Sequence, residues 1–409
     1  MPLEGKAFRD LRLKLFNLEN KNKPLQGLGY FPQKHSATGT TIFTVMSALA
    51  QQYNAINLSQ GFPDFHIDPQ LSQALGDAAR NGFNQYAPMA GLPPLRQAVA
   101  ANFKKRYGLD IDPENEITIT PGATYAIYTA FTSILQAGDE VIVLEPAYDS
   151  YIPNIEMNGA KVVPVALTAP GFHVDWNKVK DAITPLTKAI IINTPHNPGG
   201  SIWNKKDWDE LAGLVRDTDI VIVSDEVYEQ LVFDGMKHYS VLEHPELRQR
   251  SFAIYSFGKV YNCTGWKIGY CIAPPAFTQA FRRIHQFLSF TVNTPAQHAL
   301  TYILSNDTAP AIHEVMQKKR DHFLSLMKQI PFTIYEPAKG SYFQIAGYER
   351  ISDLPDMEFA QWLTKEHGVA TIPLSPFYSN KKDDKLIRFC FAKKEETLNE
   401  AVERLKRLV

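Results

Sequence analysis

Ile220-Val221-Ile222-Val223-Ser224-Asp225-Glu226-Val227-Tyr228 is the stretch of this sequence that decides the fold. It begins with a short apolar run and ends in polar groups, a pattern typical of a buried strand that leads into a ligand-binding loop. Similar apolar runs alternate with helical stretches along the chain, at residues 141–144, 162–165, 189–192, 253–255 and 268–272. This alternation predicts an α/β fold with a mainly parallel sheet, in which ligands bind at the carboxyl ends of the strands.

Two other strand-like runs also end in polar groups. Asn197 lies in Asn-Thr-Pro-His-Asn-Pro (193–198), and Lys259 ends Ser-Phe-Gly-Lys (256–259). With Asp225 and Tyr228 they supply an amide, an amine, a carboxylate and a phenol. These are the groups needed to hold pyridoxal phosphate (PLP), whose aldehyde bonds to an amine and whose protonated ring withdraws electrons from a substrate. The sequence therefore predicts a PLP site.

Each group has an expected role. Lysine readily forms Schiff bases, so Lys259 is the candidate amine. The ring nitrogen must stay protonated, and an opposite charge at ~4 Å with an effective dielectric near 20 contributes about 4 kcal/mol. A neutral hydrogen bond contributes only about 1 kcal/mol, so Asp225 is expected at the ring nitrogen. Tyr228 and Asn197 could bind the ring oxygen. Taken singly, Lys259 would be read as a surface lysine and Asp225 as a helix cap.

The cofactor phosphate needs hydrogen-bond donors and positive potential, which a helix N-terminus provides. Residues 116–120 read as a strand, residues 121–124 as a turn and residues 125–135 as a helix. The backbone N–H groups of Gly122, Ala123 and Thr124 are therefore candidate phosphate donors. Ser256 and Lys267 could complete the site. This pattern by itself has low specificity, because many strand-turn-helix units look similar.

Arg388 lies in the apolar run 385–391. An unpaired buried charge is costly, so the guanidinium must either reach solvent or meet an anion. The carboxylate of an amino acid would suit its two parallel donors. The run itself leaves both possibilities open.

Seven motifs in order resemble the class I aminotransferases of PLP fold type I, and within them the methionine aminotransferase, kynurenine aminotransferase and glutamine transaminase K group. The resemblance extends from about residue 38 to the C-terminus. The motifs are residues 57–64 (Asn-Leu-Ser-Gln-Gly-Phe-Pro-Asp), 84–88, 121–124, 193–198, 224–228, 256–259 and 265–270.

The resemblance implies a mainly parallel seven-stranded sheet sandwiched by helices, with a smaller α+β domain. It implies that Lys259 bonds to PLP, that Asp225 faces the ring nitrogen and that Asn197 and Tyr228 bind the ring oxygen. Tyr148 is expected to stack on the ring, Gly61 to line the substrate site, Arg388 to bind the substrate carboxylate and Tyr86 to reach the phosphate of a neighbouring subunit in a homodimer with shared sites.

The chain departs from the family pattern at two positions. Lys267 stands where many members have arginine, a replacement that this branch accepts. Tyr125 replaces the usual glutamate or glutamine after the phosphate turn, and the sequence offers no physical account of that change.

At 409 residues the chain is too long for one ordinary core. The predicted parts are a mobile N-terminal extension (1–36), an arm that joins the small domain (37–75), a large PLP-binding domain (76–305) and a small C-terminal domain (306–409). A formal net charge of −1 gives no reason to expect nucleic acid or an anionic membrane as partner. No apolar run approaches the ~18 residues of a membrane span.

The three cysteines lack the spacing of a metal site, so no metal is expected, and they suit a reducing cytoplasm. The predicted activity is ping-pong transfer of an α-amino group from an amino acid to a 2-oxo acid. Phe43 and Phe62 favour an apolar substrate such as methionine or an aromatic amino acid, with glutamine also a candidate. The alternatives are a carbon–sulfur β-lyase and a non-catalytic PLP sensor, because one fold and cofactor serve several functions.

Overall fold

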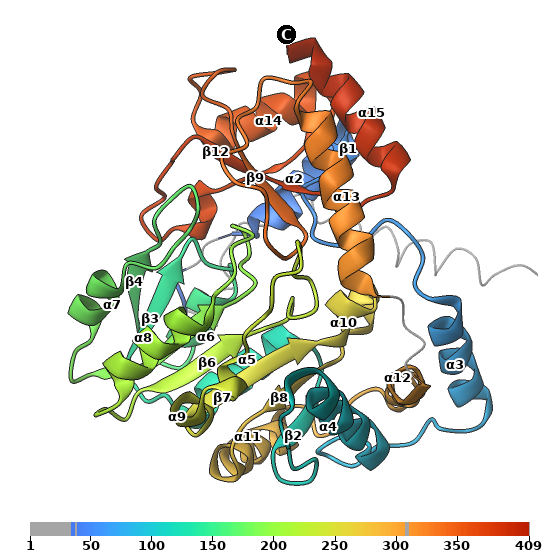
Figure 1. The fold of residues 1–409 in the computed structure, drawn as a ribbon, viewed down its shortest axis with the longest axis vertical. Coiled ribbons are helices and arrows are strands. Elements are labelled where there is room, and N and C mark those ends of the chain that lie inside the picture. Colours follow the sequence, from blue (N-terminus) through green and yellow to red (C-terminus); the bar gives the residue numbers. More distant parts are fainter. Residues whose placement is uncertain (1–33, 37–38, 307–310, 409) are drawn as a thin grey trace, which may run out of the picture. The chain divides into compact units, whose positions relative to one another are not determined.

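The computed structural model describes residues 34–36, 39–306 and 311–408, and His35–Val409 form one compact unit. Its central element is a seven-stranded sheet with the order β2-β8-β7-β6-β5-β3-β4 (Figure 1). Strands β3 to β7 pair in parallel, and β8 is antiparallel to both of its neighbours. The strands are β2 (Ile117–Thr120), β3 (Glu140–Glu145), β4 (Lys161–Ala166), β5 (Thr187–Asn193), β6 (Val221–Asp225), β7 (Ser251–Ser256) and β8 (Gly269–Ile272).

Helices cover both faces of this sheet because its inner strands carry uninterrupted apolar runs in their central positions. Ile142, Ile190 and Ile222 pack in one cluster with α4 and α8, whereas their neighbours Val141 and Ile191 pack in another with α5 and α11. Successive side chains of a strand point to opposite faces, so an uninterrupted apolar run fills two cores. The helices are α4 (Pro93–Tyr107), α5 (Ala123–Ile134), α6 (Tyr151–Glu156), α7 (Trp176–Ala182), α8 (Lys205–Val215), α9 (Pro245–Arg248), α11 (Pro275–Leu288) and α12 (Thr294–Asn306). The predicted α/β fold with a mainly parallel seven-stranded sheet is confirmed.

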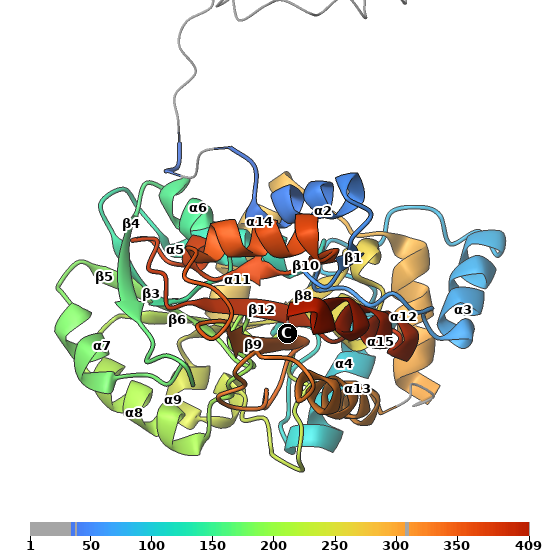
Figure 2. The ribbon, with the colours of Figure 1, turned by 90° about the horizontal axis from the view of Figure 1, so that it is seen from above.

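Two smaller sheets lie beyond the carboxyl ends of these strands (Figures 1 and 2). One is antiparallel with the order β11-β12-β9, and the other pairs β1 with β10. These strands are β1 (Ile56–Asn57), β9 (Phe343–Gly347), β10 (Val369–Ala370), β11 (Ile372–Pro373) and β12 (Leu386–Cys390). The helices around them are α2 (Ile42–Gln52), α13 (Ile312–Met327), α14 (Asp356–Glu366) and α15 (Glu395–Leu405).

The β1–β10 pair joins the segment after α2 to the C-terminal part of the chain. The domain boundaries proposed from the sequence stay a prediction, and the extension 1–36 lies outside the described residues except for residues 34–36. Within the described part of the chain, no helix is long and apolar enough to cross a membrane. Cys263, Cys271 and Cys390 are buried and form no disulfide.

Candidate active site

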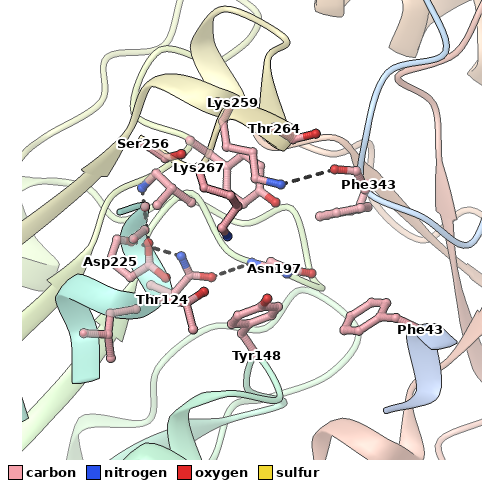
Figure 3. A pocket seen from close by; sticks show the side chains of 18 of the residues that line it. Phe43, Thr124, Tyr148, Asn197, Asp225, Ser256, Lys259, Thr264, Lys267 and Phe343 are labelled. Carbon is pink, nitrogen blue, oxygen red and sulfur yellow. Dashed lines mark hydrogen bonds between the residues drawn. The ribbon is translucent and has the colours of Figure 1, made fainter. Parts of the chain in front are cut away.

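A cavity of about 310 Å³ lies at the carboxyl ends of β5, β6 and β7 and is also lined by residues from the smaller sheets. Its size falls in the range of small-molecule sites. Figure 3 shows side chains from several segments pointing into it. The predicted site residues that line it are Gly61, Gly122, Ala123, Thr124, Tyr148, Asn197, Asp225, Tyr228, Ser256, Lys259, Lys267 and Arg388.

Lys259 lies in α10 (Phe257–Val260), the short helix that follows β7. Its Nζ donates to the carbonyl oxygen of Gly61 at 3.2 Å and lies 5.5 Å from the ring centroid of Tyr228. Burial lowers the pKa of Lys259 to about 8, and the positive charge of Lys267 contributes to this shift. The amine is therefore partly neutral, and so nucleophilic, near neutral pH.

Asp225 is the last residue of β6 and is almost fully buried. Its Oδ2 accepts a hydrogen bond from the Tyr151 hydroxyl at 2.6 Å, and its Oδ1 accepts one from the Val227 backbone N–H at 3.3 Å. Burial raises the pKa of Asp225 to about 6, and the Tyr151 hydrogen bond works in the opposite direction. The carboxylate has no bonded cation among the described residues, so it could receive a protonated ring nitrogen.

Arg388 in β12 is fully buried. It donates to Oδ1 of Asn197 and to the carbonyl oxygen of Ser59, both at 2.7 Å, and its Nε has no partner. The ring of Phe343 lies 3.8 Å from its Cζ. Burial lowers the pKa of Arg388 to about 10, so the guanidinium stays charged at neutral pH. Its location excludes the alternative in which the side chain reaches solvent.

The partners of Arg388 determine which neighbouring groups remain free to bind a ligand. No carboxylate of the described residues lies within 4.0 Å of the Arg388 guanidinium, and a buried cation with neutral partners favours an anionic ligand. The Asn197 oxygen is used by Arg388, which leaves its N–H₂ group to donate to a ligand. Asn193 holds this loop, because its Oδ1 accepts from the backbone N–H of Asn197 at 2.7 Å.

A candidate phosphate site lies at the start of α5. Gly122 has φ +84° and provides no side-chain cap, so the N–H groups of Ala123 and Thr124 remain available to a ligand. The backbone N–H of Gly122 differs from the prediction, because it donates to the carbonyl oxygen of Thr120 at 2.7 Å. A Cβ at Gly122 would lie 3.3 Å from Cε of Lys267, which shows how closely this lysine approaches the turn. Ser256 lines the same part of the cavity (Figure 3). Donors, a cation and a glycine that gives them room are the features that a phosphate requires.

The structure gives a physical account of Tyr125. Its hydroxyl lies 2.8 Å from Nδ1 of His285, and Nε2 of His285 lies 3.0 Å from the carbonyl oxygen of Met89. The Tyr125 side chain therefore joins α5 to α11 and does not line the cavity. This contact anchors the first turn of α5 against α11.

Tyr86 is the one predicted site residue that the cavity does not include. Its side chain is 80% exposed and its ring contacts that of Phe290 at 5.8 Å. Sequence reasoning missed three contributors: Tyr151, Phe343 and the Ser59 carbonyl group. Tyr151 follows Tyr148 by three residues at the start of α6, a helical spacing that could have drawn attention to it. The other two carry no local signal.

Comparisons with known proteins agree with this geometry. Residues 53–405 match the family described as aminotransferase class I and II. The chain is 46% identical to the methionine aminotransferase of Escherichia coli (strain K12), over 95% of this chain and 100% of that protein. It is 35% identical to kynurenine–oxoglutarate transaminase 1 of Mus musculus, over 87% of this chain and 92% of the relative. A solved structure of an Escherichia coli methionine aminotransferase has a TM-score of 0.90 and 46% identity, covering 93% of this chain and 100% of the other.

The chain therefore belongs to the aminotransferase class I and II family. It is a PLP-dependent enzyme that transfers the amino group of an amino acid to a 2-oxo acid, and its fold is that of the fold type I aminotransferases. The predicted family, fold, cofactor and activity are confirmed.

Proposed function

We propose that Lys259 is the amine that bonds to PLP in this enzyme and that the cavity around it is the active site. The main support for the proposal is that Lys259, Asp225 and Arg388 line one cavity, although they come from three separate segments of the chain. The donor set fits PLP: an amine, a buried carboxylate, and a helix N-terminus with a nearby lysine. Bound there, PLP supplies an electron sink for the bonding electrons released at the substrate α-carbon.

Several residues hold the cofactor in this proposal. Asp225 binds the ring nitrogen, Tyr228 and the N–H₂ group of Asn197 bind the ring oxygen, and Tyr148 stacks on the ring face. An aromatic contact of that kind contributes roughly 1 kcal/mol beyond its buried area. The phosphate is bound by the backbone N–H groups of Ala123 and Thr124, with Ser256 and Lys267, and Gly122 leaves room for it.

Lys259 also moves a proton. Once a substrate amine has displaced it, Lys259 is free to accept the α-carbon proton as a general base. Its lowered pKa suits both steps, because a neutral amine is required for bond formation and for proton abstraction. The same amine would then deliver the proton to the aldehyde carbon of the cofactor, and in the second half-reaction it would carry a proton in the opposite direction, so one residue would serve both halves of a ping-pong cycle.

Arg388 binds the substrate α-carboxylate in this proposal, and Gly61 and Asn197 complete the substrate site. A Cβ at Gly61 would lie 2.6 Å from Cζ of Phe343, so a larger residue would displace that ring from its place against Arg388. The substrate carboxylate thus meets a cation that is already oriented by Asn197 and Ser59.

We propose methionine and aromatic amino acids as the favoured substrates, with glutamine as a further candidate. Phe43, Phe343 and Phe377 have ring centroids 5.2, 3.8 and 5.7 Å from Cζ of Arg388, which supports an apolar pocket for the side chain. The names of the Escherichia coli and Mus musculus relatives agree with this choice. A screen of twenty amino acids against several 2-oxo acids tests it, and faster turnover of aspartate than of methionine or phenylalanine would contradict it.

Replacement of Lys259 by alanine tests the central proposal. The variant is expected to bind PLP non-covalently and to lose both turnover and the visible absorbance of lysine-bound cofactor. The measurement is the absorbance spectrum and the bound PLP per chain after dialysis. Visible absorbance like that of the wild type, without an added amine, would contradict the assignment of Lys259.

The β-lyase and the non-catalytic sensor have less support than the aminotransferase. The relatives named above are aminotransferases, and no observation favours the β-lyase or the sensor. Release of ammonia and pyruvate from a cysteine conjugate without a 2-oxo acid would favour the lyase. Binding of DNA in a direct titration would favour a regulatory sensor. We expect neither result.

We also propose a homodimer with shared sites, located in the cytoplasm. Exposed aromatic side chains support the dimer, because large apolar groups in contact with water are typical of interaction surfaces. Tyr86 and Phe287 are 80% and 86% exposed, and Tyr86 contacts Phe290. In this arrangement Tyr86 reaches the phosphate site of the second subunit.

A further inference from the structure

Glu226 lies between two proposed cofactor ligands, Asp225 and Tyr228, but bonds to groups that do not line the cavity. Its side chain is fully buried. Oε1 accepts hydrogen bonds from the Ser224 hydroxyl at 2.8 Å and the Val241 backbone N–H at 3.0 Å. Oε2 lies 2.9 Å from Nε2 of His238 and accepts a bond from the Tyr255 hydroxyl at 3.0 Å. Four partners for one carboxylate make a fully satisfied buried anion.

The hydrogen bonds of Glu226 connect two segments of the chain that carry proposed site residues. The chain leaves β6 after Asp225 as an irregular turn, and the backbone N–H of Glu226 donates to the carbonyl oxygen of Ile254 at 2.9 Å. Tyr255 immediately precedes Ser256 at the end of β7, and Lys259 lies in the short helix α10 that follows. The Glu226 carboxylate therefore fixes the turn of Asp225 and Tyr228 against the strand that leads to Lys259.

Among the described residues, no lysine or arginine is bonded to Glu226, and its one basic partner is His238. Nδ1 of His238 is buried and has no partner among the described residues, so a second N–H there would be left without an acceptor. His238 is accordingly a neutral donor through Nε2. Glu229, in the same turn, differs from Glu226 because its carboxylate forms an ion pair with Arg106 at 3.3 Å.

The negative charge of Glu226 affects the adjacent carboxylate of Asp225. Burial is the main cause of the raised pKa of Asp225, and repulsion from Glu226 adds to it. The same negative potential attracts a positive charge placed beside Asp225, because two buried anions stabilise a cation more than one does.

We propose that Glu226 is a positioning residue of the cofactor site: its buried carboxylate holds the turn that presents Asp225 and Tyr228, and its charge helps to keep the bound ring nitrogen protonated. The inference rests on the proposed roles of Asp225 and Tyr228. It assigns to Glu226 no contact with cofactor or substrate.

Glu226→Gln removes the charge and keeps the shape. The glutamine oxygen can accept from Val241, and its N–H₂ group can donate to Tyr255 and to a His238 that carries its proton on Nδ1. We therefore expect the apoprotein to fold, with a moderately lower melting temperature, because the Nδ1–H of His238 would have no acceptor among the described residues. The dissociation constant of PLP should rise roughly ten- to hundredfold, the size found when groups that orient metal ligands are removed. The pH at which the bound cofactor changes its absorbance should fall.

Two further variants separate the contributions. Tyr255→Phe removes one of the four bonds to Glu226, together with the contact between the Tyr255 and Ser240 hydroxyls, but leaves the charge. We therefore expect a smaller rise in the PLP dissociation constant and an unshifted absorbance transition. Glu116→Gln is the matched control: the Glu116 side chain is 12% exposed, pairs with Arg248 and lies just before the amino end of β2. It should lower stability without changing PLP binding.

The PLP affinities and spectra of these variants show whether Glu226 positions the cofactor site or only stabilises the fold. A Glu226→Gln protein with wild-type PLP affinity and spectrum would overturn the inference, as would a loss of affinity matched by Glu116→Gln. If Glu226→Gln does not fold, Tyr255→Phe decides, and an unchanged PLP dissociation constant in that variant contradicts the proposal. Failure of the wild-type apoprotein to bind PLP would instead contradict the proposed function itself.

Discussion

Tyr151 is the single residue whose contact most affects the proposed role of Asp225. Its hydroxyl donates to Oδ2 of Asp225 at 2.6 Å, and this bond lowers a pKa that burial has raised to about 6. Tyr151→Phe removes the donor, so the pKa of Asp225 should rise further. A hydrogen bond to a charged group contributes about 1.5–3 kcal/mol, which predicts a loss of PLP affinity of at least about tenfold near pH 7. Titration of the apoprotein with PLP measures it.

Titration with PLP at several pH values tests whether Asp225 must be ionised for the cofactor to bind. Asp225 must be ionised to attract a protonated ring, and it takes up a proton as the pH falls through about 6. Wild-type affinity should therefore fall below that pH, and in Tyr151→Phe the fall should begin at a higher pH. Tyr348→Phe is the control, because that hydroxyl donates to the carbonyl oxygen of Leu354. Identical pH profiles for Tyr151→Phe and the wild type would refute the role of Tyr151.

Arg388 provides a second test at the level of one residue. Arg388→Lys keeps the charge but replaces a planar fork by a single ammonium group, which cannot make two parallel hydrogen bonds. We expect a higher KM for amino acids and a lower kcat, with kcat/KM reduced by about tenfold or more. Steady-state kinetics with an α-amino acid and the matching amine without a carboxylate provide the measurement. An equal effect on both substrates would contradict the proposed carboxylate contact.

At the scale of elements, the start of α5 is the feature on which the proposed phosphate site depends. Gly122 precedes the helix with φ +84°, where an added Cβ would also crowd the Lys267 side chain at 3.3 Å. Gly122→Ala should therefore strain the turn by about 1 kcal/mol and displace Lys267. We expect a marked loss of affinity for PLP and little change for pyridoxal, which lacks the phosphate. Equilibrium titration with both compounds measures the difference.

Gly108 offers a matched control for this prediction. It follows α4 with φ +71°, and a Cβ there would meet no atom within 4 Å. Gly108→Ala also places a Cβ at positive φ, in the less restrictive left-handed region (ψ 10°, against 170° at Gly122), far from the phosphate turn. It should lower the melting temperature without changing the affinity for PLP. If both variants lose PLP affinity equally, the effect of Gly122→Ala arises from general destabilisation.

At the scale of the whole molecule, the proposed dimer makes a prediction about assembly. Phe287, near the end of α11, is 86% exposed. Phe287→Glu should convert a dimer into monomers, because a charge buried in an interface without a partner is costly. Sedimentation velocity measures the mass, and PLP affinity should fall as Tyr86 is withdrawn from the second subunit.

Leu186 supplies the control for the assembly experiment. It is 55% exposed and lies in the turn before β5, away from Phe287 in the sequence. Leu186→Glu should leave the mass unchanged. A wild-type protein that sediments as a monomer at all concentrations and yet has full activity would contradict the shared site.

Much of this arrangement could be predicted from local patterns. An uninterrupted apolar run such as 220–223 must be buried on both faces, which defines a strand of a covered parallel sheet. Arg388 lies in the middle of β12 and its run left its role open, whereas the proposed chemistry of Lys259 and Asp225 follows from side-chain type and from their positions at or just after strand ends. For the same reason, the phosphate turn before α5 was recognisable from a strand, a glycine and a helix in succession.

The contacts that complete the site depend on the tertiary structure. Tyr151 and Asp225 are 74 residues apart, and Arg388 and the Ser59 carbonyl group are 329 residues apart. Tyr125 meets His285 across 160 residues, which is why its substitution had no explanation in the sequence. The pattern of a segment determines which faces are buried, whereas the partners of a buried polar group depend on strand order and on how distant segments pack. Sequence alone thus determined the elements and the chemical groups of this enzyme, and the tertiary structure decided which of those groups meet.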